Sequence, residues 1–171
     1  MAEPLALPRG AVHLAPAPPA ARHALRGRPE TLARAAQALG LRVPETCRAV
    51  RDGDRALLWL GPDEFLLLQP PGIAAAGLAA LAVDPVIAVD ISQRQAGLIL
   101  SGNDAASLLN AGCPLDLDPA PFPVGACTRT LLGRTEVVLW RAAPETFHLE
   151  VARSFLPYAV AFLREAAHGL D

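Results

Sequence analysis

Apolar and polar residues follow strand and helix periodicities in short segments from about residue 23 onward. In the first half, apolar residues recur at helical spacing over Pro29–Leu39, and Gly40 can end that helix. Turn sequences rich in Gly and Asp separate three predicted strands: Thr46–Arg51, Arg55–Leu60 and Glu64–Gln69. A short alanine-rich helix is predicted from Gly72 to about Ala82.

The second half repeats this order of elements. Asn103 is placed to cap a short helix that Gly112 would end, and Ser154 is placed to cap a final helix. Three strands are predicted between these helices: Ala126–Leu131, Thr135–Arg141 and Thr146–Val151. Between the halves, Val86–Ile91 and Gly97–Leu100 are predicted to be extended, and the first is apolar enough for a central strand.

Landmark residues also recur in the same order in both halves. The matching pairs are Leu25 with Leu100, Cys47 with Cys127, Gly53 with Gly133, Trp59 with Trp140, and Phe65 with Phe147. We therefore predict a duplicated helix–three-strand–helix unit, with repeats at about 24–85 and 97–168. Two repeats are too few for an open solenoid, so they should close into a single α+β domain over 23–171 with antiparallel or mixed sheets.

The composition favours a globular protein with a buried core and argues against nucleic-acid-binding and membrane-spanning proteins. Residues 1–22 are rich in Pro and Ala and are predicted to form a flexible arm. A chain of 171 residues that is 52% hydrophobic can bury a core, and its net charge of −2 argues against a nucleic-acid-binding protein. The sequence has no membrane-spanning run and no targeting signal, so we expect a cytoplasmic protein. Its three widely spaced cysteines are expected to be reduced and mostly buried.

The basic residues are all arginine. Without lysine, the chain cannot form a Schiff base or use a Walker-type phosphate lysine. Residues 1–55 carry a net charge of +4 and residues 56–171 a net charge of −6, counted from the sequence. Either composition drifts around a mobile N-terminal segment, which is the favoured interpretation, or a positive arm docks on an acidic surface.

Chemistry-bearing residues are scattered. The sequence contains no GxGxxG, P-loop or GxSxG motif, and no two histidines have metal-ligand spacing. His148 falls on the predicted polar face of a strand, where a solvated imidazole is favoured over a catalytic base. Asp116 and Asp118 point the same way on an extended segment and could bind a cation, but a carboxylate pair in a proline-rich loop is more often structural.

One segment is a low-ranking candidate for a ligand site. Asp90, Ser92 and Arg94 follow the predicted buried strand, and ligand contacts are common at such strand ends. A structural capping role is favoured for them over ligand binding. The residues alone therefore predict no catalytic residues and no metal site, which favours a binding or scaffold role.

Several motifs together resemble the gamma subunit family of heterotetrameric sarcosine oxidase, from about residue 24 to 168. They are Trp59-Leu-Gly-Pro-Asp-Glu-Phe-Leu-Leu-Leu68, Val89-Asp-Ile-Ser-Gln-Arg94, Leu100-Ser-Gly-Asn-Asp-Ala105, Cys113-Pro-Leu-Asp-Leu117, Arg129-Thr-Leu-Leu-Gly133 and Phe147-His-Leu-Glu-Val-Ala-Arg-Ser-Phe155. Asp90-Ile-Ser92 and Ser101–Ala106 are also similar to the aminomethyltransferase of the glycine-cleavage system. That likeness implies a folate-binding-domain-like fold of two related subdomains.

The resemblance implies an accessory subunit of a complex that oxidatively demethylates sarcosine to glycine. Such a complex uses oxygen, makes hydrogen peroxide and can transfer the one-carbon unit to tetrahydrofolate. FAD, FMN, NAD and tetrahydrofolate are then implied for the partner subunits and no cofactor for this chain. The expected partners are the other sarcosine oxidase subunits, with no nucleic acid and no membrane, and self-association of the isolated chain stays open.

Two alternatives stay open beside the subunit interpretation. The chain could be a stand-alone folate- or pterin-binding module related to aminomethyltransferases, with a ligand in the cleft between the repeats. It could also be an independent aminomethyl or methyl transferase, which is the weakest of the three hypotheses. The sequence does not separate sarcosine from a related N-methylated amine as the substrate of the complex.

Overall fold

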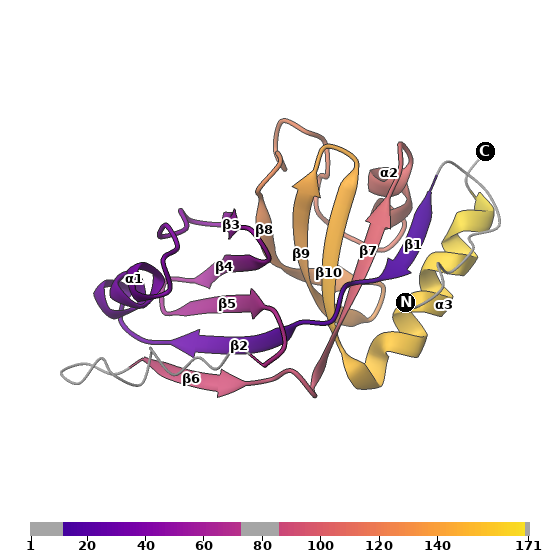
Figure 1. Ribbon diagram of the computed structural model, residues 1–171. Helices are drawn as coiled ribbons and strands as arrows, with labels where there is room; N and C mark the ends of the chain where they lie inside the picture. Colours follow the sequence, from indigo (N-terminus) through magenta and orange to yellow (C-terminus); the bar gives the residue numbers. More distant parts are fainter. Residues whose placement is uncertain (1–11, 73–85, 170–171) are drawn as a thin grey trace. The chain divides into compact units, whose positions relative to one another are not determined.

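Two five-stranded antiparallel sheets, each in its own compact unit, make up the chain (Figure 1). The computed structural model describes residues 12–72 and 86–169. One unit comprises Pro19–Gln93 and is called the 19–93 unit. The other, called the 94–171 unit, begins at Arg94 and also takes in the strand at His13–Pro16. The expected α+β class with antiparallel sheets is confirmed.

In the 19–93 unit, one helix covers one face of the sheet. Its elements are β2 (Ala21–Arg26), α1 (Pro29–Ala38), β3 (Ala49–Asp52), β4 (Arg55–Gly61), β5 (Glu64–Gln69) and β6 (Ile87–Asp90), with strand order β3-β4-β5-β2-β6. Leu32, Ala35 and Ala36 of α1 are fully buried against Leu25 and Leu67 of the strands. Apolar burial of this kind stabilises the unit.

The end of α1 follows the prediction closely. Gly40 has a φ of +71°, a conformation that glycine adopts without strain. Its N–H donates to the Gln37 carbonyl at 2.9 Å, and the Leu41 N–H donates to the Ala36 carbonyl at 2.9 Å. These two bonds and the buried Leu41 form a Schellman motif, which satisfies carbonyls that the helix end would otherwise leave free.

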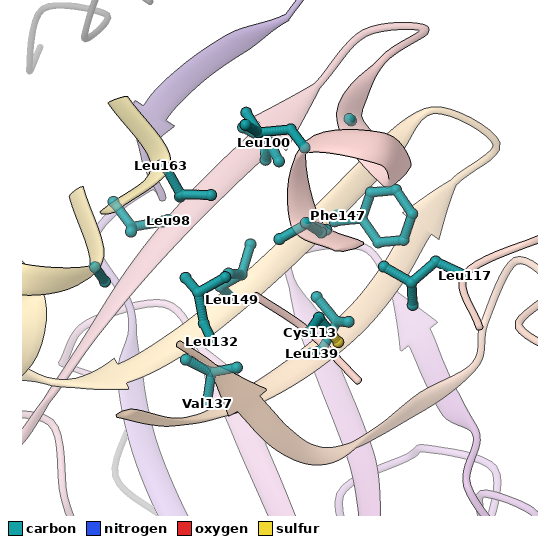
Figure 2. Close-up of a cluster of buried hydrophobic side chains, with 14 of the residues drawn as sticks. Leu98, Leu100, Cys113, Leu117, Leu132, Val137, Leu139, Phe147, Leu149 and Leu163 are labelled. Carbon is teal, nitrogen blue, oxygen red and sulfur yellow. The ribbon is translucent and has the colours of Figure 1, made fainter. Parts of the chain in front are cut away.

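The 94–171 unit has a larger core. Its elements are β7 (Gln95–Ser101), α2 (Ala105–Asn110), β8 (Cys127–Leu132), β9 (Thr135–Ala143), β10 (Thr146–Ala152), a 3₁₀ turn (Arg153–Phe155), α3 (Leu156–Ala166), a second 3₁₀ turn (Ala167–Gly169) and β1 (His13–Pro16), with strand order β1-β7-β10-β9-β8. Figure 2 shows side chains from β7, β9 and β10 meeting those of α3 and the loop before β8. Phe147 and Leu100 are fully buried there.

The two sheets have the same strand order when corresponding elements are compared. Read from the other end, the second sheet is β8-β9-β10-β7-β1, and the first is β3-β4-β5-β2-β6. Leu25 stands opposite Phe65 in one sheet, and Leu100 stands opposite Phe147 in the other. Each of the landmark leucines therefore has the landmark phenylalanine as its cross-strand partner.

Part of the expected flexible arm is in strands. Residues 13–16 form β1 and pair with β7, where Leu14 is fully buried, and β2 begins at Ala21. Proline lacks an N–H but is tolerated at the border of a sheet, and Pro16 is the last residue of an edge strand. Residues 1–11 lie outside the described residues, as does nearly all of the helix predicted from Gly72 to about Ala82.

Three other local predictions are wrong. Val86–Ile91 was expected to contain a central strand, but β6 lies at the edge of its sheet. Asn103 does not cap α2, which begins after Asp104 with no side-chain cap bond. Ser154 lies in the 3₁₀ turn, and α3 begins at Leu156. In each case an apolar or capping pattern was present, but tertiary packing set the boundary.

Gly112 follows the C-cap of α2, as predicted, and it is also a point of close approach. Its carbonyl accepts a hydrogen bond from the Gly133 N–H at 2.9 Å, and an added Cβ would collide with the Phe162 ring of α3. Gly133 has a φ of +60° in the β8–β9 turn, and an added Cβ there would meet the Tyr158 hydroxyl. That hydroxyl accepts a hydrogen bond from the Arg134 N–H at 3.0 Å. The two glycines therefore let α3 lie against the hairpin.

Replacing Gly133 with alanine should destabilise the fold more than the same change at Gly53. Both have positive φ in two-residue hairpin turns, but a Cβ at Gly53 would meet nothing within 4 Å. We expect a loss of about 1 kcal/mol for Gly53→Ala from backbone strain. Gly133→Ala should lose about 2–4 kcal/mol, because crowding against α3 is added. Thermal and urea unfolding measure the difference, and equal losses would contradict the packing argument.

Candidate functional site

The structure joins two of the three candidate ligand residues in a tight turn. Asp90 ends β6, and the Ser92 N–H donates to its Oδ1 at 2.8 Å. The Ser92 Oγ accepts a hydrogen bond from the Arg22 N–H at 2.9 Å, and the Ile91 N–H donates to the Arg22 carbonyl at 2.9 Å. The turn thus continues the pairing of β2 with β6. Each of these bonds is one that a structural turn requires.

The hydrogen bonds from Ser92 change the titration of Asp90. The Ser92 side chain and then its backbone N–H lower the pKa of the Asp90 carboxyl, desolvation raises it, and His23 lowers it further. A carboxylate stabilised in this way is charged at neutral pH. Asp90 therefore presents a negative charge to solvent at the end of β6.

Arg94 belongs to the 94–171 unit. Its carbonyl accepts a hydrogen bond from the Arg153 N–H at 2.8 Å, which ties the start of β7 to the 3₁₀ turn after β10. Among the described residues, the polar contacts link Asp90 to Ser92 and do not include the Arg94 side chain. Ligand binding by these three residues stays a prediction.

A buried pair of a histidine and a carboxylate lies on β10. Sequence reasoning predicted the strand but not this pair. The His148 Nε2 and the Glu150 Oε1 are 2.7 Å apart, and their side chains are 12% and 1% exposed. The Trp140 ring stacks on the imidazole with centroids 5.8 Å apart. The expectation that His148 is solvated is therefore wrong, and so is the expectation of one wet face on this strand.

The signal for this pair was present in the sequence but ambiguous. Residues two apart on a strand share a face, so His148 and Glu150 had to be neighbours. Whether that face is covered depends on tertiary structure, and here Val138 and Trp140 on the same face are also buried. A hydrogen bond satisfies the imidazole and the carboxylate and offsets part of their desolvation. We assign this pair a structural role.

Arg141 is a second buried polar residue that sequence reasoning missed. It is 2% exposed, its Nη2 donates to the Leu117 carbonyl at 2.7 Å, and its guanidinium lies 4.7 Å from the centre of the Phe147 ring. Burial lowers the pKa of this guanidinium, and the Asp118 carboxylate opposes that effect. Arg141 thus attaches the loop before β8 to the sheet of its own unit.

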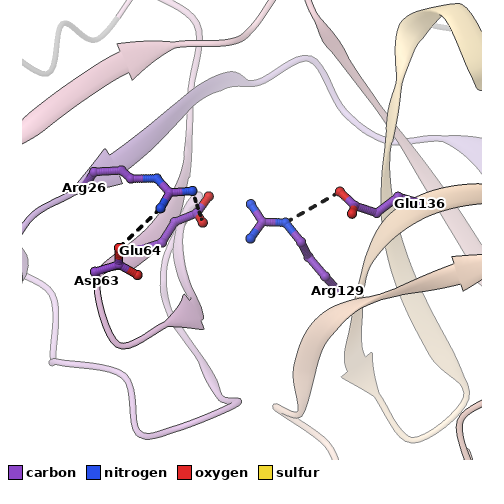
Figure 3. Close-up of polar contacts among 5 residues, drawn as sticks. All are labelled: Arg26, Asp63, Glu64, Arg129 and Glu136. Carbon is purple, nitrogen blue, oxygen red and sulfur yellow. Dashed lines mark hydrogen bonds and ion pairs between the residues drawn. The ribbon is translucent and has the colours of Figure 1, made fainter.

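Three further ion pairs each lie within a single unit (Figure 3). In the 19–93 unit, Arg26 contacts Asp63 at 3.3 Å and the mostly buried Glu64 at 2.7 Å. In the 94–171 unit, Arg129 and Glu136 are 3.7 Å apart on neighbouring strands. The exposed Arg26–Asp63 and Arg129–Glu136 pairs contribute little to stability, and we infer no separate function for any of these contacts.

The other candidate groups are accounted for locally. The Asp118 N–H donates to the Asp116 Oδ1 at 3.0 Å, as in a structural turn. Cys113 and Cys127 are buried and Cys47 is exposed, and none of the three forms a disulfide. Within residues 12–72 and 86–169, no three metal-ligating side chains come together, and no helix is long and apolar enough to span a membrane.

Comparison with known proteins gives a consistent family. Residues 26–169 match the family described as "Sarcosine oxidase, gamma subunit family". The chain is 36% identical over 135 residues to sarcosine oxidase subunit gamma of Corynebacterium sp. (strain P-1) and to that of an Arthrobacter species. Each match covers 77% of this chain and 66% of the relative, so the chain spans just under two thirds of the length of these relatives.

Solved structures agree with the sequence comparison. The fold is similar to a chain of heterotetrameric sarcosine oxidase from Corynebacterium sp. U-96, with a TM-score of 0.85 and 32% identity over 92% of this chain and 84% of that one. It also resembles aminomethyltransferase T of the glycine cleavage system from Bartonella henselae, with a TM-score of 0.64 and 15% identity. The second match covers 91% of this chain and 46% of that one, and it shows a shared fold alone.

Replacing Ser92 with alanine should raise the pKa of Asp90 toward its ordinary value. In the wild type the pKa is lower in the folded chain, so Asp90 stabilises the fold above the unfolded pKa. That contribution is lost as the pH falls through the lowered pKa, below about pH 4. Ser92→Ala should therefore lose less stability on acidification. NMR titration of the Asp90 carboxyl measures the shift, and Ser107→Ala, in α2, is the matched control.

Removing the Arg141 side chain should destabilise the 94–171 unit. Arg141→Ala leaves the Leu117 carbonyl without its donor and opens a space over the Phe147 ring. We expect a loss of about 2–4 kcal/mol in the free energy of unfolding. The exposed Arg134→Ala should change it by less than about 0.5 kcal/mol. Urea unfolding distinguishes the two, and a near-neutral Arg141→Ala would show that the loop is held by other contacts.

Proposed function

The chain belongs to the sarcosine oxidase gamma subunit family, and on that premise we propose that it is the accessory gamma-type subunit of a heterotetrameric sarcosine oxidase. One observation carries the proposal: the family match and the similar solved chain both extend over most of the described fold. Both sheets contribute to that similarity, since the solved chain covers 92% of this one.

The proposal places the chemistry on the partner subunits. They would bind FAD, FMN, NAD and tetrahydrofolate, oxidatively demethylate sarcosine to glycine and pass the one-carbon unit to tetrahydrofolate. Support comes from the titratable groups of this chain. His148 and Glu150 bond each other in a buried site, and Asp90 is held by Ser92. Because the side chains of His148 and Glu150 are only 12% and 1% exposed, a substrate has little access to them.

Two further features belong to the same proposal. We place the complex in the cytoplasm, in keeping with the three cysteines of this chain, which form no disulfide. We also propose that the two units descend from one duplicated helix–three-strand–helix unit. The equivalent strand orders and the cross-strand pairs Leu25–Phe65 and Leu100–Phe147 support the duplication.

A folate- or pterin-binding module is the second candidate function. The fold similarity to aminomethyltransferase T favours it, but at 15% identity that similarity concerns the fold alone. The likeness that suggested it lies around Asp90 and in Ser101–Ala106, and in the structure the Ser92 N–H donates to the Asp90 carboxylate, as in a structural turn. Titration of the purified chain with tetrahydrofolate tests this alternative. Heat of binding together with a raised melting temperature would support it over the accessory role.

Co-expression with the flavoprotein subunits that the proposal assigns to the complex should test the subunit proposal. A tagged chain is expected to recover a yellow complex that oxidises sarcosine and releases hydrogen peroxide. The flavoprotein subunits prepared without the chain should melt at a lower temperature, because a lost interface removes its binding free energy. A colourless chain recovered alone, or partners with unchanged stability and full activity without it, would contradict the proposal.

A further inference from the structure

The four edge strands of the two sheets differ in how they are protected. Edge strands expose unpaired backbone groups, and proteins usually blunt them with charged residues, proline or a covering element. β1 ends in Pro16, β3 carries Arg51 and Asp52, and β8 carries Arg129. β6, with the sequence Ile-Ala-Val-Asp, carries its one charged residue at its last position, and its other three residues are apolar and exposed.

The apolar side chains of β6 form a small exposed surface. Ile87 is 64% exposed and Val89 is 48% exposed. They stand opposite Arg26 and Ala24 of β2, so they share one face of the sheet. Arg26 is already paired with Asp63 and Glu64 on that side. Two large apolar side chains next to a satisfied ion-pair cluster are typical of the border of a protein–protein interface.

The backbone of β6 also has an open side. Within the described residues, β6 is hydrogen-bonded to β2 alone. The Ile91 N–H donates to the Arg22 carbonyl of β2. In an antiparallel pair every second residue bonds the neighbouring strand, so the backbone groups of Val89 and Ile87 also point toward β2. Ala88 and Asp90 therefore direct their N–H and C=O groups toward the open edge. An extended segment alongside β6 would satisfy these groups, which is how strand addition gains affinity.

The charge at the end of β6 indicates what such a segment contains. Asp90 is exposed and is charged at neutral pH. Its polar contacts are with Ser92, and no arginine of the described residues forms an ion pair with it. A complementary segment would carry a basic residue facing Asp90 and apolar residues facing Ile87 and Val89.

We propose that β6 is a docking edge for an extended segment of a partner subunit, which adds a strand to the sheet of the 19–93 unit. The segment alternates apolar residues against Ile87 and Val89 and places an Arg or Lys against Asp90. This inference rests on the proposed accessory function. A second copy of this chain fits less well, because β6 carries no basic residue and self-pairing would bring no cation to Asp90.

Three variants of the co-expressed complex separate the parts of this proposal. Val89→Lys places a charge in the apolar contact, and Ala88→Pro removes an N–H that faces the open edge while leaving the bonds to β2. Each should weaken assembly at least tenfold in apparent Kd. Val124→Lys is the matched control, because Val124 is 52% exposed in a turn of the other unit. It should assemble normally.

Hydrogen exchange gives a readout that does not depend on variants. The amides of Ala88 and Asp90 should exchange rapidly in the isolated chain and slowly in the complex. Protection already present in the isolated monomer would overturn the proposal, and so would normal assembly of both Val89→Lys and Ala88→Pro. A dimer of the isolated chain that Val89→Lys dissociates would assign the edge to a second copy instead. If the wild-type chain recovers no partner, the proposed function itself fails.

Discussion

Strand register is the constraint on which both sheets depend. A slip of one residue in either sheet would turn its apolar side chains to the opposite face, so the register must be fixed by pairs that fit only one way. Leu25 faces Phe65 in one sheet and Leu100 faces Phe147 in the other. With this register, Arg141 comes to stand over Phe147 and reaches the Leu117 carbonyl. Loop attachment in the 94–171 unit therefore follows from strand pairing.

The same register explains why local sequence predicted most elements but not the buried polar groups. The hairpins β3–β4, β4–β5, β8–β9 and β9–β10 were predictable, because alternating apolar residues flank recognisable turn sequences. β1 was not, because the prolines around it indicate an arm and only pairing with β7 makes it a strand. The burial of His148 and Glu150 was not predictable either. Alternation identifies two faces of a strand but not whether the second face is covered.

The candidate site shows a related limit. A polar triplet after an apolar strand suggested a ligand site, yet Asp90 and Ser92 bond each other and Arg94 lies in the other unit. Short polar residues after a strand satisfy local backbone groups as readily as they bind ligands, and sequence alone does not separate the two roles. The family was instead predictable from many short motifs taken together, whose order matches one family along the chain.

An accessory role and an unprotected edge strand are consistent with each other. A protein that acts alone has reason to blunt every edge, because an exposed apolar edge promotes aggregation. A subunit that is permanently assembled can retain one open edge, since the partner covers it. In β6 the apolar residues that suggested a central strand lie at the border of the sheet. With a partner segment bound, β6 would lie between β2 and that segment and would be a central strand. The prediction of a central strand from the apolar residues would then hold for the assembly, although it fails for the isolated chain.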